Sequence, residues 1–275
     1  MSTADSLFDE YDESPKPVRT PAPFICEDSG ALSLQFEAGT VQSQMQLATP
    51  DLLTIGYTRT MMGFLLFNGR PRHIGMIGLG GGSLAKYCYR YLPHTRISVA
   101  EISPEVIALR GSFYIPNDDF RFNVFCEDGA DFVARHSNEF DVLIVDGFNA
   151  GGQPEELCSR RFYDDCHGAL AADGVMAVNL CDSRFGILVS RMRHSFGNRV
   201  VLAEADDGDN KIAFAGKGNA LCQTEEQSRK RLAYLEHHHP INFSQAAIDL
   251  HRKCQMLQPP SDKCHLRNTK VVEIR

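Results

Sequence analysis

A glycine-rich turn constrains the fold of this chain more than any other feature. The segment Gly78-Leu79-Gly80-Gly81-Gly82-Ser83 directly follows an apolar run and precedes a run with helical spacing. Glycine allows a tight turn and lets main-chain N–H groups at a helix N-terminus approach a ligand, because a Cβ would block that approach. The pattern indicates an α/β nucleotide-binding domain. The spacing Gly80-x-Gly82-x-x-Ala85 also fits a relaxed dinucleotide fingerprint, so the turn alone leaves both NAD and S-adenosylmethionine (AdoMet) open as the cofactor.

Strand-like and helical runs alternate around this turn. We expect strands at residues 73–79, 96–101, 121–127, 140–146, 174–180, 199–204 and 211–216. We expect the intervening helices at residues 83–91, 104–110, 129–136, 159–170 and 184–196. Such alternation implies parallel crossovers, and the last two strands are close enough in sequence to form a hairpin. The prediction is an α/β fold with a doubly wound, seven-stranded, AdoMet-methyltransferase-like Rossmann sheet.

Acidic residues end three successive expected strands. Glu101 closes the second strand, where an acid accepts hydrogen bonds from both ribose hydroxyls. Asp128-Gly129 follows the third strand, where an acid can receive the adenine amine, and Asp146-Gly147 follows the fourth. Each acid alone is also a common helix cap or turn residue, but the series lines the crevice where open α/β sheets bind ligands. Asp146 is the catalytic candidate, since a carboxylate there could bind an attacking amine and remove its proton.

The sequence predicts that the chain is divided into four parts. Residues 1–22 are acidic and proline-rich and are expected to form a disordered arm. Residues 23–70 are expected to form a β-hairpin subdomain with turns at Ser29-Gly30 and Ala38-Gly39, followed by one linking helix over 52–67. Residues 71–218 are the Rossmann-like domain, and 219–275 are a helical tail with two short helices interrupted at Pro240.

Composition excludes several classes of partner. The formal net charge is −7, with no basic stripe, so nucleic acid is not expected as a partner. No apolar stretch approaches the ~20 residues of a membrane span, and the N-terminus is acidic where a signal peptide would be basic. The nine cysteines form no CxxC pair. We therefore expect reduced thiols, no membrane association and a cytoplasmic location.

Two further clusters have weaker functional interpretations. The acidic turn Asp206-Asp207-Gly208-Asp209 lies between the last two expected strands and could attract a polyamine, although such a cluster is more often a solvated turn. The tail carries His251, Cys254 and the adjacent pair Cys264-His265, which are zinc-ligand types. Adjacent residues do not easily point both side chains at one ion, so we expect no metal.

Several of these motifs together resemble the polyamine aminopropyltransferase family, the spermidine synthases and their relatives. The resemblance runs from about residue 24 to residue 216. It rests on the hairpin, Gln42 before a helix carrying Tyr57, the glycine turn, Val99-Ala100-Glu101-Ile102-Ser103-Pro104, Glu127-Asp128-Gly129, and Val145-Asp146-Gly147 followed by Arg161-Phe162-Tyr163.

The resemblance implies an activity and a set of site residues. The family moves the aminopropyl group of decarboxylated AdoMet to a small amine such as putrescine, by direct displacement at the carbon beside the sulfonium. By resemblance Asp146 would deprotonate the attacking amine, and Tyr57 and Asn149 would lie on the acceptor side. Asp207 of the acidic turn is a further candidate for binding the acceptor, from its charge alone. The cofactor would be bound by Gln42, Gly78, Gly80, Gly81, Gly82, Glu101, Ile102, Asp128 and Gly129. Relatives pair through the hairpin region, which predicts a homodimer or higher homo-oligomer.

The sequence departs from the family pattern in four places. Gly81 stands where the family has an aspartate that holds the aminopropyl amine, and Asn149 replaces a second carboxylate. Tyr57-Thr58-Arg59 replaces a Tyr-His-Glu or Tyr-Gln-Glu triplet, and the acidic turn replaces a tyrosine-containing loop. Each lost carboxylate removes a partner for a cationic nitrogen. Two alternatives therefore stay open: methyl transfer to a small acceptor, with intact AdoMet using the space at Gly81, and a non-catalytic nucleoside-binding protein.

Overall fold

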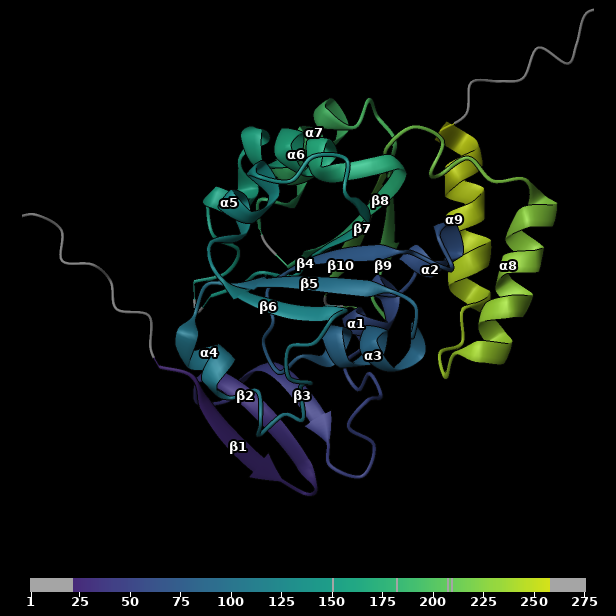
Figure 1. Ribbon diagram of the computed structural model, residues 1–275. Coiled ribbons are helices and arrows are strands. Elements are labelled where there is room, and N and C mark those ends of the chain that lie inside the picture. Colours follow the sequence, from purple (N-terminus) through teal and green to yellow (C-terminus); the bar gives the residue numbers. More distant parts are fainter. Residues whose placement is uncertain (1–21, 150, 182, 207, 209, 258–275) are drawn as a thin grey trace, which may run out of the picture.

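A seven-stranded sheet forms the centre of the molecule, with strands in the order β6-β5-β4-β7-β8-β10-β9 (Figure 1). The computed structural model describes residues 22–149, 151–181, 183–206, 208 and 210–257. The strands of the sheet are β4 (His73–Ile77), β5 (Arg96–Glu101), β6 (Phe122–Cys126), β7 (Phe140–Val145), β8 (Leu170–Leu180), β9 (Val200–Glu204) and β10 (Lys211–Gly216). All neighbours are parallel except β10, which runs antiparallel to both β8 and β9. The predicted doubly wound sheet is confirmed, and its strand order reverses between β4 and β7.

Helices cover both faces of this sheet (Figure 1). One face carries α3 (Ser83–Tyr91) and α4 (Pro104–Ala108), and the other carries α5 (Gly129–Ala134), α6 (Arg160–Ala169), α7 (Phe185–Ser195) and the 3-10 helix η1 (Glu156–Cys158). Side chains of one strand alternate between the two faces. Met76 therefore packs in one apolar core and its neighbour Ile77 in the other. Burial on both faces explains why the central strands are continuously apolar in sequence.

Side-chain caps define where three of the helices begin. The Asp128 carboxylate accepts hydrogen bonds from the N–H groups of Ala130 and Asp131 at the start of α5. Ser159 caps α6 in the same way, and Ser103 caps α4. Such caps satisfy N–H groups that a helix leaves free in its first turn. The helix starts expected at residues 104, 129 and 159 accordingly agree with the structure to within one residue.

A separate three-stranded antiparallel sheet precedes the large sheet. It contains β1 (Phe24–Asp28), β2 (Ala31–Glu37) and β3 (Thr40–Gln46), in the order β1-β2-β3. Both of its turns lie where the sequence predicts them, and Gly30 and Gly39 have φ values of 78° and 87° that glycine adopts readily. The strand β3 contacts α3. The predicted β-hairpin subdomain is therefore confirmed, with three strands joined by these two turns, and this small sheet adjoins α3.

The single linking helix expected over residues 52–67 is wrong. The structure has two short helices, α1 (Gly56–Met61) and α2 (Phe64–Phe67), separated by a turn at Met62 and Gly63. A Cβ on Gly63 would lie 2.8 Å from the main-chain oxygen of Thr60 and 2.9 Å from the ring of Phe214. The chain turns there because glycine lets it approach β10. The expected packing of this segment against the core is confirmed, since Phe64 and Leu65 are fully buried.

Two helices of the C-terminal tail cover the β9 side of the molecule (Figure 1). They are α8 (Glu225–His238) and α9 (Ser244–Leu257), and Pro240 lies between them as expected. Leu235, Phe243 and Leu250 join the same apolar core as the sheet. Within the residues that the structure describes, no helix is both long and apolar enough to cross a membrane. The four-part division of the chain stays a prediction, and its first part falls almost wholly outside the described residues.

Candidate active site

The glycine turn passes directly against the end of β7. Gly78, Gly80 and Gly82 have φ values of 92°, 52° and 68°, a region that favours glycine. A Cβ on Gly78 would lie 2.4 Å from the main-chain oxygen of Asp146. The turn therefore joins two adjacent strand ends, β4 and β7, at the point where the strand order reverses. Ligands of open α/β sheets bind at such a point.

Glu101 is held at the end of β5 by main-chain N–H groups. Leu79 in the glycine turn donates to Oε2 of Glu101 at 2.8 Å, and Ser103 donates to Oε1 at 2.9 Å. The residue is only 9 % exposed. Each carboxylate oxygen has a second acceptor site, so both can accept a further hydrogen bond. The structure thus fixes this carboxylate beside the turn, with capacity left for hydroxyl donors.

Three more of the expected cofactor residues lie along the same edge of the sheet. Ile102 follows β5 and is 66 % exposed, and Asp128 follows the neighbouring parallel strand β6. Gly129 is needed for packing, because a Cβ there would lie 2.3 Å from Cγ2 of Ile77. One oxygen of Asp128 is engaged in capping α5. The structure therefore brings Glu101, Ile102 and Asp128 to one edge.

The space beside Gly81 is filled. A Cβ on Gly81 would lie 2.7 Å from Oγ of Ser43 and 3.1 Å from the ring of Phe113. The buried ammonium of Lys86 holds this arrangement by donating to the main-chain oxygen of Phe113 at 2.8 Å. Burial lowers the pKa of Lys86 to about 8. The space that a side chain at position 81 would need is therefore taken by the side chains of Ser43 and Phe113.

Asp146 lies at the end of β7 with two hydrogen-bond donors. The Tyr57 hydroxyl of α1 donates to Oδ2 at 3.1 Å, and the Asn179 side-chain amide of β8 donates to Oδ1 at 2.9 Å. Burial raises the pKa of Asp146 to about 6, against the two hydrogen bonds, which lower it. A carboxylate with a pKa near 6 can take up a proton close to neutral pH. The structure thus joins Asp146 and Tyr57 by a direct hydrogen bond.

Two asparagines complete this arrangement, and neither was predicted from the sequence. Asn179 is 3 % exposed, and its carbonyl oxygen accepts a hydrogen bond of 2.9 Å from the side-chain amide of Asn210. Asn179 lies inside the apolar run of β8, where a single polar residue forms no recognisable sequence motif. A buried amide within such a run is the signal that could have identified it, because buried polar groups need partners.

The acidic turn between β9 and β10 is paired with α1. Asp206 forms an ion pair of 3.1 Å with Arg59, whose guanidinium also donates to the main-chain oxygens of Leu53 and Thr54. The predicted site residue Asp207 lies outside the described residues. The one carboxylate of the turn whose contacts are described is therefore neutralised by an arginine, on the helix that carries Tyr57.

Two expected site residues lie nearby with other contacts. Asn149 is exposed, and its side-chain oxygen accepts from the N–H of Gly151 within its own turn. Gln42 is half-buried on β3 next to Ser43. Because neighbouring side chains of a strand point to opposite faces, Gln42 projects from the face opposite Ser43. Their roles as acceptor and cofactor ligands stay predictions.

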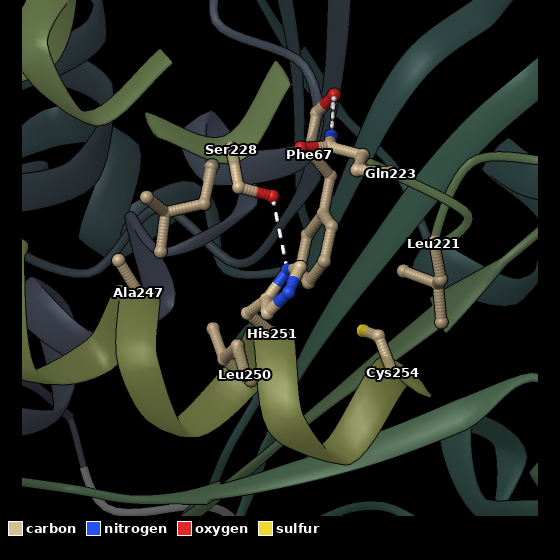
Figure 2. A pocket seen from close by; sticks show the side chains of 9 residues that line it. Phe67, Leu221, Gln223, Ser228, Ala247, Leu250, His251 and Cys254 are labelled. Atoms are coloured by element: carbon tan, nitrogen blue, oxygen red, sulfur yellow. Dashed lines mark hydrogen bonds between the residues drawn. The ribbon is translucent and has the colours of Figure 1, made fainter. Parts of the chain in front are cut away.

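A small hollow lies away from this site, between α2, α8 and α9 (Figure 2). Its polar side chains bond one another or the main chain: Ser228 contacts Nδ1 of His251 at 3.1 Å, and Gln223 donates to the main-chain oxygen of Phe67. Cys254 also lines it, whereas Cys264 and His265 fall outside the described residues. In the described part of the chain, no group of three or more His, Cys, Asp or Glu side chains could hold a metal ion.

Comparison with known sequences finds similarity to the polyamine aminopropyltransferases. The model described as the spermine/spermidine synthase domain matches residues 54–182. A polyamine aminopropyltransferase of Neisseria meningitidis serogroup B is 34% identical over 223 residues, which cover 80% of this chain and 85% of that protein. A polyamine aminopropyltransferase of Chromobacterium violaceum is 35% identical over 224 residues, covering 80% and 86%.

Solved structures show the same fold at lower identity. Spermidine synthase from Thermotoga maritima aligns with a TM-score of 0.56 and 20% identity, covering 80% of each chain. A spermidine synthase in complex with the transition state analogue AdoDATO aligns with a TM-score of 0.56 and 24% identity, covering 68% of this chain and 66% of that one. Human methyltransferase-like protein 13 in complex with SAH aligns with a TM-score of 0.57 and 18% identity, covering 77% and 97%. At these identities the structural likeness establishes the fold alone.

Proposed function

This chain belongs to the spermine/spermidine synthase family, whose members are transferases, and we propose that it moves the aminopropyl group of decarboxylated AdoMet to a small polyamine such as putrescine. The observation that carries the proposal is the Asp146 carboxylate, held by Tyr57 and Asn179 beside the glycine turn. A protonated amine is not a nucleophile, so a base with a pKa near 6 is suited to prepare it.

The proposed reaction is a single displacement. Asp146 orients one amine of the acceptor and takes its proton. The nitrogen then forms a bond to the carbon beside the sulfonium, and the carbon–sulfur bond breaks with its electron pair going to sulfur. The products are the aminopropylated amine and methylthioadenosine. Tyr57 and Asn179 keep the carboxylate oriented while it accepts the proton.

The cofactor would be bound along the edge formed by β4, β5 and β6. Glu101 would accept hydrogen bonds from the ribose hydroxyls, Asp128 would receive the adenine amine, and exposed Ile102 would pack on the base. Gln42, Gly129 and the glycines of the turn would complete this set. The glycine turn supplies the close main-chain approach that the nucleoside needs.

The surroundings of Gly81 favour this substrate over intact AdoMet. Methyl transfer would need room beside Gly81 for the carboxylate of intact AdoMet. Ser43 and Phe113 occupy that room, since even a Cβ at Gly81 would lie within 3.1 Å of both. A carboxylate placed here would have to displace the Ser43 side chain or the Phe113 ring.

The acceptor side would be formed by Tyr57, Asn149 and Asp207 around Asp146. Asp206 is paired with Arg59, which leaves Asp146 as the described carboxylate best placed to meet an amine. An acceptor with one reacting nitrogen near Asp146 and an aliphatic body suits this arrangement.

The test is product formation followed by mass spectrometry. The purified protein is incubated with putrescine and either decarboxylated AdoMet or AdoMet, beside Asp146→Asn and the control Asp165→Asn, whose carboxylate pairs with Arg161 on the surface of α6. We expect spermidine and methylthioadenosine only with decarboxylated AdoMet, a loss of at least 100-fold in Asp146→Asn and no loss in the control. A methylated product would favour methyl transfer, and binding without any product would favour a nucleoside-binding protein.

A further inference from the structure

The two asparagines beside Asp146 form a chain of hydrogen bonds in which each side-chain amide donates toward the carboxylate. Asn210 donates from its side-chain nitrogen to Oδ1 of Asn179, and Asn179 donates from its own nitrogen to Oδ1 of Asp146. Asn179 is buried, so water does not replace either partner. An amide has one carbonyl and one NH2 end, and its orientation is decided by the groups on each side. Asn210 occupies the carbonyl end and leaves the NH2 end for Asp146.

The orientation of Asn179 determines how it acts on Asp146. With the NH2 end turned to the carboxylate, it stabilises the charged form. With the carbonyl end turned there, two acceptors would face each other, and the buried carboxylate would lose a donor. Asn210 favours the first orientation, because its NH2 group donates to the carbonyl of Asn179.

The connection reaches from the candidate base to the turn between β9 and β10. Asn210 directly precedes β10, and its main-chain oxygen accepts from the N–H of Ala205 across the turn. The helix α1 contacts β8, β9 and β10 and closes the arrangement through Tyr57 and Arg59. The charged groups on these elements are Arg59 with its partner Asp206, Asp173 near the start of β8, Glu204 on β9, and Lys211, which lies over the ring of Phe185.

We propose that Asn210 is a positioning residue, which holds Asn179 in its donor orientation and thereby keeps the Asp146 carboxylate charged and aligned for the acceptor amine. The proposal rests on the proposed function for its catalytic consequence. Its structural part, the control of Asp146 by Asn210 through Asn179, does not depend on which amine is used. Asn210 touches neither substrate nor the reacting atoms in this arrangement.

The test compares Asn210→Ala and Asn210→Leu with the wild type and with Asn219→Ala, a control at an exposed asparagine. Leucine resembles asparagine in shape but has neither a hydrogen-bond donor nor an acceptor. Comparing it with alanine therefore separates loss of the donor from loss of side-chain volume. The pKa of Asp146 is measured by carboxyl-carbon NMR titration of the substrate-free protein, with its signal assigned from Asp146→Asn. Steady-state kcat and KM are measured over the same pH range.

We expect both Asn210 variants to raise the pKa of Asp146 by about half a unit to one unit, because Asn179 is then no longer held with its NH2 end toward the charged carboxylate. We expect kcat to fall about ten-fold, the acidic limb of its pH profile to move upward, and the KM for the cofactor to stay unchanged. A wild-type titration in both variants would overturn the proposal. A shifted titration in a protein that makes no spermidine would support the role of Asn210 and refute the proposed function.

Discussion

Tyr57 and Asp146 are 89 positions apart in the sequence, and the tyrosine hydroxyl donates a 3.1 Å hydrogen bond to the carboxylate. The contact joins the linking segment before the large sheet to the end of β7. Tyr57 therefore acts on the candidate base directly, and the short helix α1 is part of the site.

Tyr57→Phe tests this contact. The ring and its packing are retained, but the donor is lost, so the charged form of Asp146 is less stable and its pKa rises above about 6. Because the proposed reaction needs the carboxylate form, we expect kcat to fall about ten-fold and its acidic limb to move to higher pH. The measurement is kcat between pH 5 and pH 9. Tyr89→Phe is the matched control, since Tyr89 donates to Asp119 at 2.8 Å outside the site; an unchanged pH profile in Tyr57→Phe would contradict the assigned role.

Asp146→Asn is expected to stabilise the protein at neutral pH. Burial raises the pKa of Asp146 from 3.8 to about 6, so the folded state binds the proton more tightly than the unfolded state. The stability that this proton contributes is fully present below pH ~4 and is lost as the pH rises through 6. We therefore expect a gain on the order of 1 to 3 kcal/mol in the free energy of unfolding at pH 7.5, and almost none at pH 4. Denaturant unfolding at both pH values measures it, and equal effects at the two would refute this explanation.

Gly81→Ala is expected to destabilise the protein by about 1 to 3 kcal/mol, because the added methyl group meets Ser43 and Phe113. Binding of methylthioadenosine, measured by calorimetry, should weaken with it. Gly168→Ala is the contrasting variant: Gly168 lies in α6 with open space around its Cβ position, so alanine there should be neutral or stabilise by up to about 1 kcal/mol. Equal stability of the two variants would show that the turn at Gly81 is not closed.

Glu101→Gln tests the carboxylate beside the glycine turn. Both of its oxygens accept from main-chain N–H groups, so an NH2 group in place of one oxygen puts a donor against a donor. We expect methylthioadenosine to bind at least ten-fold more weakly in calorimetry. Glu105 is exposed at the second residue of α4, and the control variant Glu105→Gln should bind methylthioadenosine as tightly as the wild type does. Undiminished binding in Glu101→Gln would remove this residue from the proposed nucleoside site.

Local patterns were enough to predict most of the sheet. Each central strand is an apolar run of its own, and Ser103, Asp128 and Ser159 are caps that act within three residues of their position. The need for glycine at positions 78 and 82 can be predicted from the sequence, because the turn that they form involves only neighbouring residues. The expected linking helix is wrong at Gly63, where the chain lies against Phe214, a residue far along the sequence that no local pattern connects to it.

The sequence alone therefore determined the order of strands and helices, the glycine turn, and the acids Glu101, Asp128 and Asp146 at strand ends. Only the tertiary structure decided what surrounds them. Asn179 and Asn210 belong to different strand regions that become neighbours when β10 pairs with β8, and Ser43 meets Gly81 because the small sheet packs beside α3. Hydrogen bonds and close packing act over a few ångströms between residues far apart in the chain, and no local pattern records which segments will meet.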